Sequence, residues 1–284
     1  MKIGAHVTIA GGLPNAIHKA KKLGAECIQI FPAPPQMWKV PDRDPREIQE
    51  FKQLRKKSGI DPVVFHSIYL INLASPKNSV FWGSIGSLRK TLEIAAQIEA
   101  LGVIFHVGSS GEKTFADVLP HVAKAFQEIL KSTPKNTFLI IENSAGAGNL
   151  VGDKIEEIGQ IIQASGADPR IKVCLDTQHL FASGYNIGDK KGIEKLFADF
   201  DKKIGLERLI AIHANDSKSD CGSNLDRHEN IGKGKIGIKG FKNFFSHPAI
   251  KALPIFIETP GFEDTGPDEK NLEILKTIRK ELKL

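Results

Sequence analysis

Histidines and carboxylates stand at the ends of six consecutive apolar segments of this chain. The residues that close these segments are His66, His106, Glu142, Asp176, His213 and Glu258. Two short motifs lie just beyond. D-T-Q-H adds His179 after Asp176 in what we interpret as a strand-to-loop turn, and D-R-H adds Asp226 and His228 in a long loop. The chain thus offers nine candidate metal ligands, five of its nine histidines and four carboxylates.

This mixture of imidazole nitrogens and carboxylate oxygens suits Zn²⁺, with Mn²⁺ or Fe²⁺ as alternatives. Taken singly, a histidine at a strand end is more often a core residue, and an acidic residue there often caps the next helix. Four carboxylates gathered in one place repel one another, however, and no Lys or Arg recurs beside them. Cations are therefore needed, and at roughly three or four protein ligands per ion the set accommodates two or three metals.

Clustered divalent metals are a common solution for phosphoester hydrolysis, because one ion lowers the pKa of a bound water while others hold the attacking and leaving oxygens. The alternative is sugar isomerisation, in which one or two metals polarise a ketose. Isomerase sites usually carry more carboxylates and fewer histidines than this set. The pattern therefore favours hydrolysis.

Eight short, nearly all-apolar segments would position these residues. They are 2–7, 26–31, 63–68, 102–107, 137–142, 171–176, 209–214 and 254–259. Between them, apolar residues recur three and four positions apart, as in amphipathic helices. Strands this apolar are buried on both faces, and alternation with helices makes them parallel. The pattern predicts an α/β fold, a (β/α)₈ barrel whose metal site lies at the mouth where the carboxyl ends of the strands meet.

The competing architecture is an open doubly wound sheet, but no G-x-G-x-x-G motif follows any strand. No low-complexity linker divides the chain, so residues 1–284 are expected to form one barrel domain. The composition, 41% hydrophobic and 25% charged, excludes disorder, collagen and coiled coil as the main state. The net charge of +6 permits a polyanionic partner without demanding one.

Three cysteines are too few for a disulfide framework, and Cys27 and Cys174 lie in apolar runs, as buried residues would. No apolar stretch is long enough to span a bilayer, and the opening M-K-I-G-A-H-V is typical of a strand and not of a signal peptide. We therefore expect a cytoplasmic protein without a membrane partner. A monomer is expected because one barrel would complete the site.

Four longer motifs contain most of the candidate ligands. They are H-S-I-Y-L-I-N-L (66–73), C-L-D-T-Q-H-L-F-A-S-G-Y (174–185), I-H-A-N-D-S-K (212–218) and D-R-H-E-N-I-G-K-G-K-I-G (226–237). With G-A-H-V (4–7) and E-T-P (258–260), they cover essentially the whole chain in order. In this set the chain resembles the endonuclease IV family, also called deoxyribonuclease IV.

The resemblance implies a zinc-dependent apurinic/apyrimidinic (abasic-site) endonuclease of base-excision repair. Such an enzyme is a (β/α)₈ barrel with three zinc ions per chain, one of them replaceable by Mn²⁺. It would cut double-stranded DNA 5′ to an abasic deoxyribose, leaving a 3′-hydroxyl and a 5′-deoxyribose phosphate. Carried over by motif, the resemblance implies three ligand sets, one for each zinc ion. The first ion would bind His66, His106 and Glu142, and the second would bind Glu142, as a bridge, with Asp176, His213 and Glu258. The third would bind His179, Asp226 and His228. Glu142 and Glu258 would be the catalytic carboxylates, with Glu142 orienting or deprotonating the attacking water.

The resemblance also implies residues that read the lesion. Tyr69 and Leu70 occupy the place of a Tyr-Leu pair that enters the duplex where the base is missing. The chain departs from the family after the second strand, because Gln36 stands where an Arg would reach into the base stack. Lys218 and Arg227, in the long loop after the seventh strand, are expected to neutralise phosphates, so binding should weaken as salt rises.

Two other functions fit parts of the pattern. A sugar isomerase or epimerase on the same barrel would account for a metal site, but it gives Asp226 and His228 no natural use. A lesion-binding protein with purely structural metals is the non-enzymatic alternative, and Gln36 is the only feature that keeps it open. Of the remaining histidines, only His6 is expected near the mouth, in a supporting role.

Overall fold

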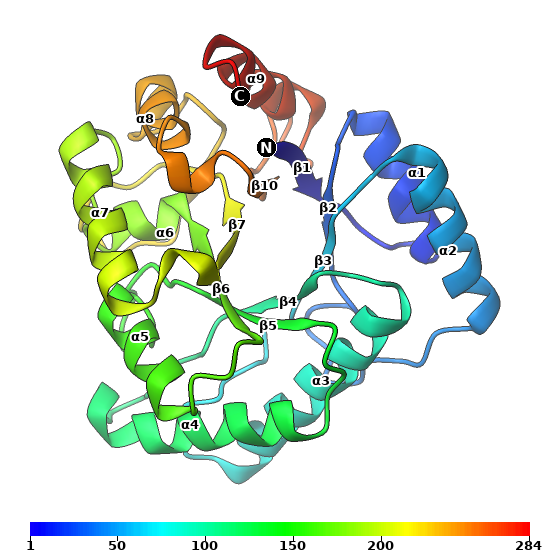
Figure 1. Cartoon of the computed structure of the whole chain (residues 1–284), viewed down its shortest axis with the longest axis vertical. Helices are drawn as coiled ribbons and strands as arrows, with labels where there is room; N and C mark the ends of the chain where they lie inside the picture. Colours follow the sequence, from blue (N-terminus) through cyan, green and yellow to red (C-terminus); the bar gives the residue numbers. More distant parts are fainter.

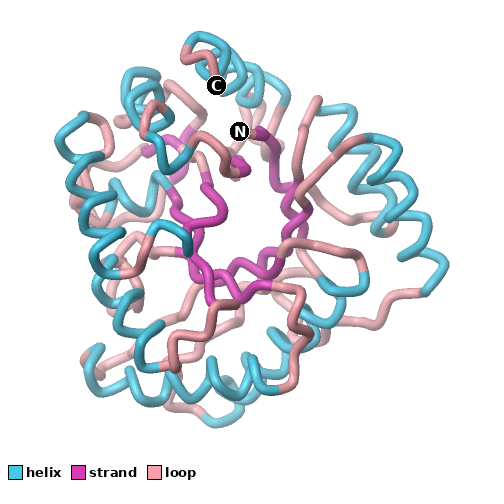
Figure 2. Tube along the Cα trace, in the orientation of Figure 1, coloured by secondary structure: helices cyan, strands magenta, loops and turns pink.

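Eight parallel strands close into a barrel at the centre of the molecule (Figures 1 and 2). The computed structural model describes residues 1–284. The strands are β1 (Lys2–His6), β2 (Ile28–Ile30), β3 (Val63–His66), β4 (Gly102–Phe105), β5 (Phe138–Glu142), β6 (Ile171–Asp176), β7 (Leu209–His213) and β10 (Pro254–Ile257). The predicted (β/α)₈ barrel is confirmed, and an open sheet is excluded because every one of the eight strands pairs with two neighbours in a closed ring.

Helices surround the strands on the outside of the barrel (Figure 2). They are α1 (Leu13–Leu23), α2 (Pro45–Ser58), α3 (Asn78–Gln97), α4 (Phe115–Lys131), α5 (Ile155–Ala164), α6 (Thr177–Ala182), α7 (Lys190–Lys203), α8 (Gly237–Phe245) and α9 (Glu269–Glu281), with two 3₁₀ turns, η1 (Leu206–Arg208) and η2 (Pro248–Ile250). None of these helices is sufficiently long and apolar to cross a membrane.

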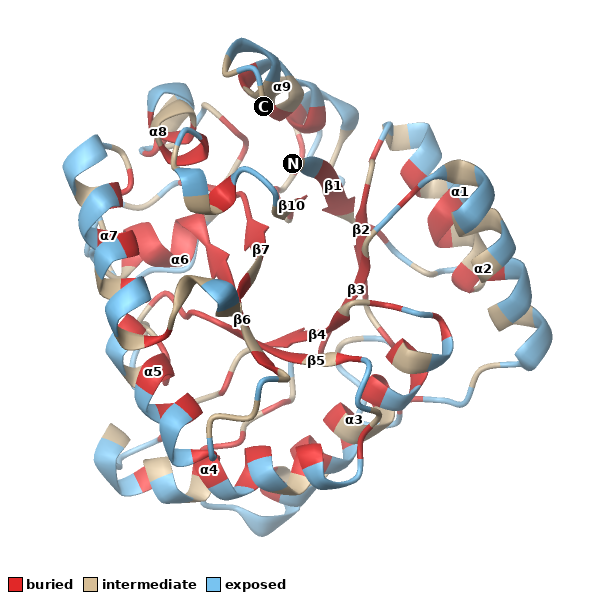
Figure 3. Ribbon diagram, viewed as in Figure 1, coloured by how far each residue is buried: buried red, intermediate tan, exposed pale blue.

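The core has two parts, one on each side of the strands. A cluster of 69 buried residues fills the space between strands and helices. A second cluster, of seven residues drawn from the strand segments, fills the inside of the barrel and includes Cys27 and Cys174. Burial on both faces explains why the strands are so uniformly apolar, and Figure 3 shows them almost entirely as buried residues.

Local signals set the ends of several helices. Pro45 begins α2 directly after Asp44, whose side chain accepts a hydrogen bond from the backbone N–H of Arg46. Gly59 ends the helix with φ 72°, a left-handed conformation that suits glycine. Because these signals are local, the ends of α2 can be predicted from the sequence.

Two segments differ from the prediction. The D-T-Q-H motif does not form a strand-to-loop turn, because α6 begins immediately after Asp176, whose side chain accepts from the backbone N–H of His179. The long segment after β7 is not wholly irregular either. It contains a short antiparallel hairpin, β8 (Asp216–Ser217) with β9 (His228–Glu229). Both elements are too short for periodicity to reveal them.

A partly buried ion pair ties the start of the chain to the last helix. Both oxygens of Glu26 accept hydrogen bonds from the guanidinium of Arg279, at 2.6 and 2.8 Å, and one of them also accepts from the backbone N–H of Ile3 at 2.8 Å. Arg279 also donates to the carbonyl of Met1. Partial burial disfavours the Glu26 carboxylate, but Arg279 and the Ile3 N–H outweigh it and lower its pKa.

Replacing Glu26 by Gln should therefore destabilise the barrel by about 1–2 kcal/mol at pH 7. Since the folded-state pKa is lowered, this contribution is fully present above the unfolded pKa of about 4.3. It is lost as pH falls through the lower folded value. Urea unfolding of Glu26→Gln at pH 7 and at pH 3 measures both effects. Glu156→Gln, which removes a more exposed pair with Lys203, is the control and should change little. Equal destabilisation at both pH values would contradict the prediction.

Candidate metal centre

The site is built by the alternation of side chains along the strands. Residues two apart on a strand face the same side, so the residue two positions after each one inside the barrel points into the mouth. The pairs are Gly4 and His6, Cys27 and Gln29, Val64 and His66, Ile104 and His106, Ile140 and Glu142, Cys174 and Asp176, Ala211 and His213, and Phe256 and Glu258. All six candidate ligands that end strand segments therefore meet at one end of the barrel.

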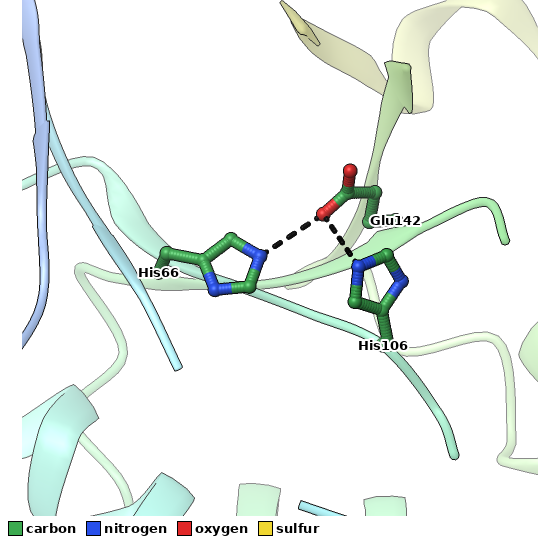
Figure 4. Close-up of side chains that lie close together, drawn as sticks. All are labelled: His66, His106 and Glu142. Carbon is green, nitrogen blue, oxygen red and sulfur yellow. Dashed lines mark hydrogen bonds and ion pairs between the residues drawn. The ribbon is translucent and has the colours of Figure 1, made fainter. Parts of the chain in front are cut away.

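Glu142 lies at the centre of this ring and is fully buried. Its Oε2 lies 3.1 Å from Nε2 of His66 and 3.4 Å from Nε2 of His106 (Figure 4). Its other oxygen, Oε1, lies 2.8 Å from Nδ1 of His213 and 3.4 Å from Nδ1 of His179. The carboxylate thus presents one oxygen to each of two neighbouring sets of nitrogens.

The remaining ligands complete two further groups. Glu142, Asp176, His213 and Glu258 bring their donor atoms within 4.8 Å of one another, as do Asp176, His179 and His228. Asp226, more than half exposed on its loop, reaches the second of these groups. Its two oxygens lie 3.4 Å from Nε2 of His179 and 3.4 Å from Nε2 of His228.

Several separations between donor atoms away from the shortest Glu142 contacts suit metal coordination better than direct hydrogen bonding. Two donors bound to one tetrahedral ion at about 2.1 Å lie roughly 3.4 Å apart. The distances of 3.4 Å from Asp226 to its two histidines match that spacing, as does 3.5 Å between His213 and Glu258. They exceed the usual range for an N–H···O hydrogen bond. Nε2 of His228 is buried and has no hydrogen-bond partner at all.

Four of the five ligand histidines have one ring nitrogen held by an oxygen that can only accept. Nδ1 of His66 faces the Ser67 carbonyl at 2.9 Å, and Nδ1 of His179 faces the Asn143 carbonyl at 3.0 Å. The other two contacts join Nδ1 of His228 to the Glu258 carbonyl and Nε2 of His213 to Oε1 of Gln29. Each such nitrogen must donate, which leaves the other nitrogen of the neutral ring free to bind a metal.

Three buried amides that the sequence analysis missed orient the ligands. Gln29 accepts from His213 at 2.7 Å and donates to Glu258 at 2.5 Å. Asn215 donates to the carboxylate of Asp176 at 2.6 Å, and Oδ1 of Asn143 accepts from the backbone N–H of Asp176 at 2.7 Å. A polar residue inside an apolar strand was the available signal for Gln29. The Asn residues stand one and two positions after their strands, where loop residues are commonly polar.

The charges of the site are strongly coupled. Burial disfavours the carboxylate of Glu142, but the neighbouring charges of His106 and His213 outweigh it and hold its pKa well below the usual range. Burial also disfavours a charged His179, yet Asp176 and Asp226 raise its pKa well above the ordinary value. The raised pKa values of His66, His179 and His213 favour protons on these three rings, which offset part of the carboxylate charge. Protons and metal ions therefore compete for the same atoms.

The pocket above these ligands has a volume of about 420 Å³. Its lining residues are His6, Phe31, His66, Tyr69, His106, His179, Asp226, His228, Glu258, Thr259, Gly266 and Pro267. No Lys or Arg is among them. A negatively charged group could enter such a pocket only if bound cations neutralised the carboxylates.

The residues expected to contact DNA lie around the pocket rim or beyond it. Tyr69 follows the end of β3, is 67% exposed and lines the pocket, whereas Leu70 is half-buried and packs against the core. Gln36 is exposed on a turn closed by a hydrogen bond from the Met37 N–H to the Pro34 carbonyl. Lys218 and Arg227 are both exposed, flanking the β8–β9 hairpin.

The histidines left out of the ligand set behave as expected. His6 lines the pocket, where Nδ1 lies 3.0 Å from Nε2 of Gln29 and 3.7 Å from Glu258. His121 and His247 stack on Phe81 and Phe197 and do not line the pocket. His6 thus supports a ligand, as the sequence analysis anticipated.

Comparison with known proteins identifies the fold and, through the more similar relatives, the family. The family model described as xylose isomerase-like TIM barrel matches residues 17–281. A protein of Halothermothrix orenii named "Probable endonuclease 4" is 39% identical over 281 residues, 99% of this chain and all of that protein. The crystal structure of endonuclease IV from Thermus thermophilus matches with a TM-score of 0.86 at 34% identity, covering 99% of this chain and 100% of the other.

A D-tagatose 3-epimerase-like protein also matches, with a TM-score of 0.73 over 100% of this chain and 98% of its own. At 20% identity, this match shows the fold alone. The relatives above 30% identity that span the whole chain carry the endonuclease name. On its sequence, its barrel and its cluster of histidines and carboxylates, the chain belongs to the endonuclease IV family.

Proposed function

We propose that this chain is a zinc-dependent apurinic/apyrimidinic endonuclease that acts in base-excision repair. It hydrolyses the phosphodiester 5′ to an abasic site in double-stranded DNA and leaves a 3′-hydroxyl and a 5′-deoxyribose phosphate. The observation that carries the proposal is the three close groups of eight histidines and carboxylates, with Asp226 beside the third, around a pocket without Lys or Arg in a member of this family.

Three zinc ions per chain would be held by the three groups, with Mn²⁺ able to replace one. The first would bind His66, His106 and Glu142. The second would bind Glu142, Asp176, His213 and Glu258, and the third would bind His179, Asp226 and His228. Glu142 is supported as the bridge because its two oxygens face different histidines. When bound, such ions lower the pKa of water and neutralise the charge of a phosphodiester.

The carboxylates of the site would act on the attacking water, in addition to the metal ions. The pKa values of Glu142 and Glu258 are both held below the ordinary range, so both groups are ionised at neutral pH and can accept a hydrogen bond from an attacking water. Glu142 is the candidate to orient or deprotonate it, because Glu142 lies at the centre of the ring. Gln29 is hydrogen-bonded to both His213 and Glu258 and so holds these two residues in place around Glu142.

The pocket would take a sugar only after that sugar has left the DNA helix. A space of about 420 Å³ admits a sugar and phosphate but not an intact duplex. Moving the sugar out of the helix costs least where the base is already missing, which favours an abasic site as substrate. The exposed ring of Tyr69 stands at the rim, 5.4 Å from Phe31 and edge-on to it. It would fill the gap that the flipped sugar leaves.

Replacing Tyr69 by Ala should weaken abasic-site recognition more than it slows the chemistry. Stacking of an aromatic ring on a base is worth about 1–3 kcal/mol, so KM should rise roughly 5- to 150-fold with a smaller change in kcat. Steady-state incision of a duplex with one abasic site measures both constants. Tyr69→Phe keeps the ring and should retain the wild-type KM. An unchanged KM in Tyr69→Ala would remove Tyr69 from the DNA interface.

The function is tested by incubating the protein with a duplex carrying one abasic site, a matched duplex without the lesion, and a panel of ketose and aldose sugars. We expect a single cut on the 5′ side of the lesion that leaves an end a polymerase can extend. The undamaged duplex and the sugars should remain unchanged. Sugar conversion without incision would favour the isomerase alternative, and lesion binding without incision would favour a non-enzymatic role.

A further inference from the structure

The glycine-rich segment N-I-G-K-G-K-I-G (230–237) wraps around one buried carboxylate. Asp216 is 0% exposed and has no cationic partner. Its oxygens instead accept hydrogen bonds from five backbone N–H groups. The donors are Ser217, Gly232, Gly234, Ile236 and Gly237, at distances between 2.8 and 3.3 Å. Asp216 thus provides hydrogen-bond acceptors for backbone N–H groups of its own segment and of a loop about twenty residues away. Without it these buried N–H groups would be unpaired.

This carboxylate also caps a helix from a distance. Ile236 is the N-cap of α8 and Gly237 is its first residue, and no local side chain caps the helix. Their N–H groups point at Asp216 instead, where the negative charge meets the positive end of the helix. Burial raises the pKa of Asp216, while the surrounding N–H groups oppose that rise.

Gly234 is required because the backbone approaches Asp216 so closely there. A Cβ at Gly234 would lie 2.5 Å from Oδ1 of Asp216 and 2.4 Å from the carbonyl oxygen of Ser217. Gly232 has φ 81°, a conformation that is unfavourable for a side chain. Contact with a carboxylate of this chain therefore accounts for Gly234, and the turn of the backbone accounts for Gly232.

The wrapped segment is continuous with the ligands of the third metal group. Asp216 pairs with Glu229, and Ser217 pairs with His228, across the β8–β9 hairpin. The hairpin is extended by the Lys218 N–H, which donates to the Arg227 carbonyl. Asp216 therefore belongs to the strand that pairs with His228, and it also binds the glycine-rich loop after β9. Asp226 lies in the loop that joins the two strands of the hairpin.

We propose that Asp216 is a positioning residue, which aligns Asp226 and His228 with His179 by organising the hairpin and the glycine-rich loop. It touches no donor atom of the site itself. The inference rests on the proposed assignment of His179, Asp226 and His228 to one metal ion. Its test uses readouts that do not depend on incision.

The test replaces the carboxylate by an amide of the same shape. In Asp216→Asn, one acceptor oxygen becomes an NH₂ group that faces N–H donors. We expect metal affinity at the third group to fall about 10- to 100-fold. Elemental analysis after dialysis against a weak chelator should then show a selective loss of about one metal per chain relative to wild type. Amide hydrogen exchange across 226–237 should accelerate even in metal-free protein. Asp189→Asn, an exposed cap of α7, is the control and should match wild type.

A second variant breaks the same contact from the other side. Gly234→Ala keeps the carboxylate but pushes the loop away from it, so it should reproduce the partial metal loss if Asp216→Asn proves unable to fold. Wild-type metal content together with wild-type exchange across 226–237 in either folded variant would overturn the inference. If wild-type protein cut no abasic DNA but the variants still lost metal selectively, the proposed function would fail and the role of Asp216 would stand.

Discussion

Replacing Glu142 by Gln is expected to reduce incision of abasic DNA by at least about 10³-fold, since the work of a general base alone is worth 10²–10⁴-fold. The substitution keeps the shape of the side chain but removes the negative charge that lies among four histidines. It also removes one of the two oxygens proposed to bridge neighbouring metals. Single-turnover incision measures the loss without interference from product release.

The control for this variant is Glu156→Gln, which removes an exposed carboxylate paired with Lys203 and should leave incision unchanged. Thermal melting and metal analysis of Glu142→Gln accompany the assay. They distinguish a folded protein that has lost its metal from one that keeps its metal and has lost only the chemistry. Incision within about tenfold of wild type would show that Glu142 neither bridges metals nor acts on the attacking water.

Removing bound metal is expected to abolish incision and to lower the melting temperature together. Without cations the buried carboxylates of the mouth must be balanced by protons, and the folded state loses the free energy of metal binding. We expect the stripped protein to melt at least about 5 °C lower than the loaded protein. Zn²⁺ should restore both properties, whereas Mg²⁺, which prefers oxygen ligands, should restore neither.

Loss of bound metal is expected to increase as pH falls. Ligand histidines bind metal only when deprotonated, and the neighbouring carboxylates raise the pKa of His179. Protons therefore compete more strongly as pH falls, so a given chelator should remove more metal at pH 5 than at pH 8. Full incision by protein shown to be metal-free, at either pH, would contradict the metal-dependent mechanism.

Much of the fold, and which candidate ligands gather at one end of the barrel, could be predicted from the sequence because both follow from local patterns. Apolar runs separated by helical periodicity indicate the strands, and each strand delivers its ligand two positions after an interior residue. The resemblance to endonuclease IV implied the same six strand-end positions together with His179, Asp226 and His228. Even the departure at Gln36 is a property of the chain alone.

The supporting contacts could not be predicted, because they join residues that are distant in the sequence. Gln29 contacts His213 across 184 positions, and Asn215 reaches Asp176 across 39. Gln29 stands out as a polar residue inside an apolar strand, but its local sequence does not identify its partner, and Asn215 resembles other polar loop residues. The helix α6 was missed for a related reason, since a helix of six residues is too short for a periodic signal.

By itself, the sequence determined which donor atoms the site has and in what order they follow one another around the barrel. The alternation of side chains along each strand decides which residues point into the mouth of the barrel. Only the tertiary structure decided which donors face one another: that Glu142 turns one oxygen toward His66 and the other toward His213, and that Asp226 reaches His179. The physical reason is barrel closure, which brings the ends of separate strands within a few ångströms and makes their distances a property of the whole ring.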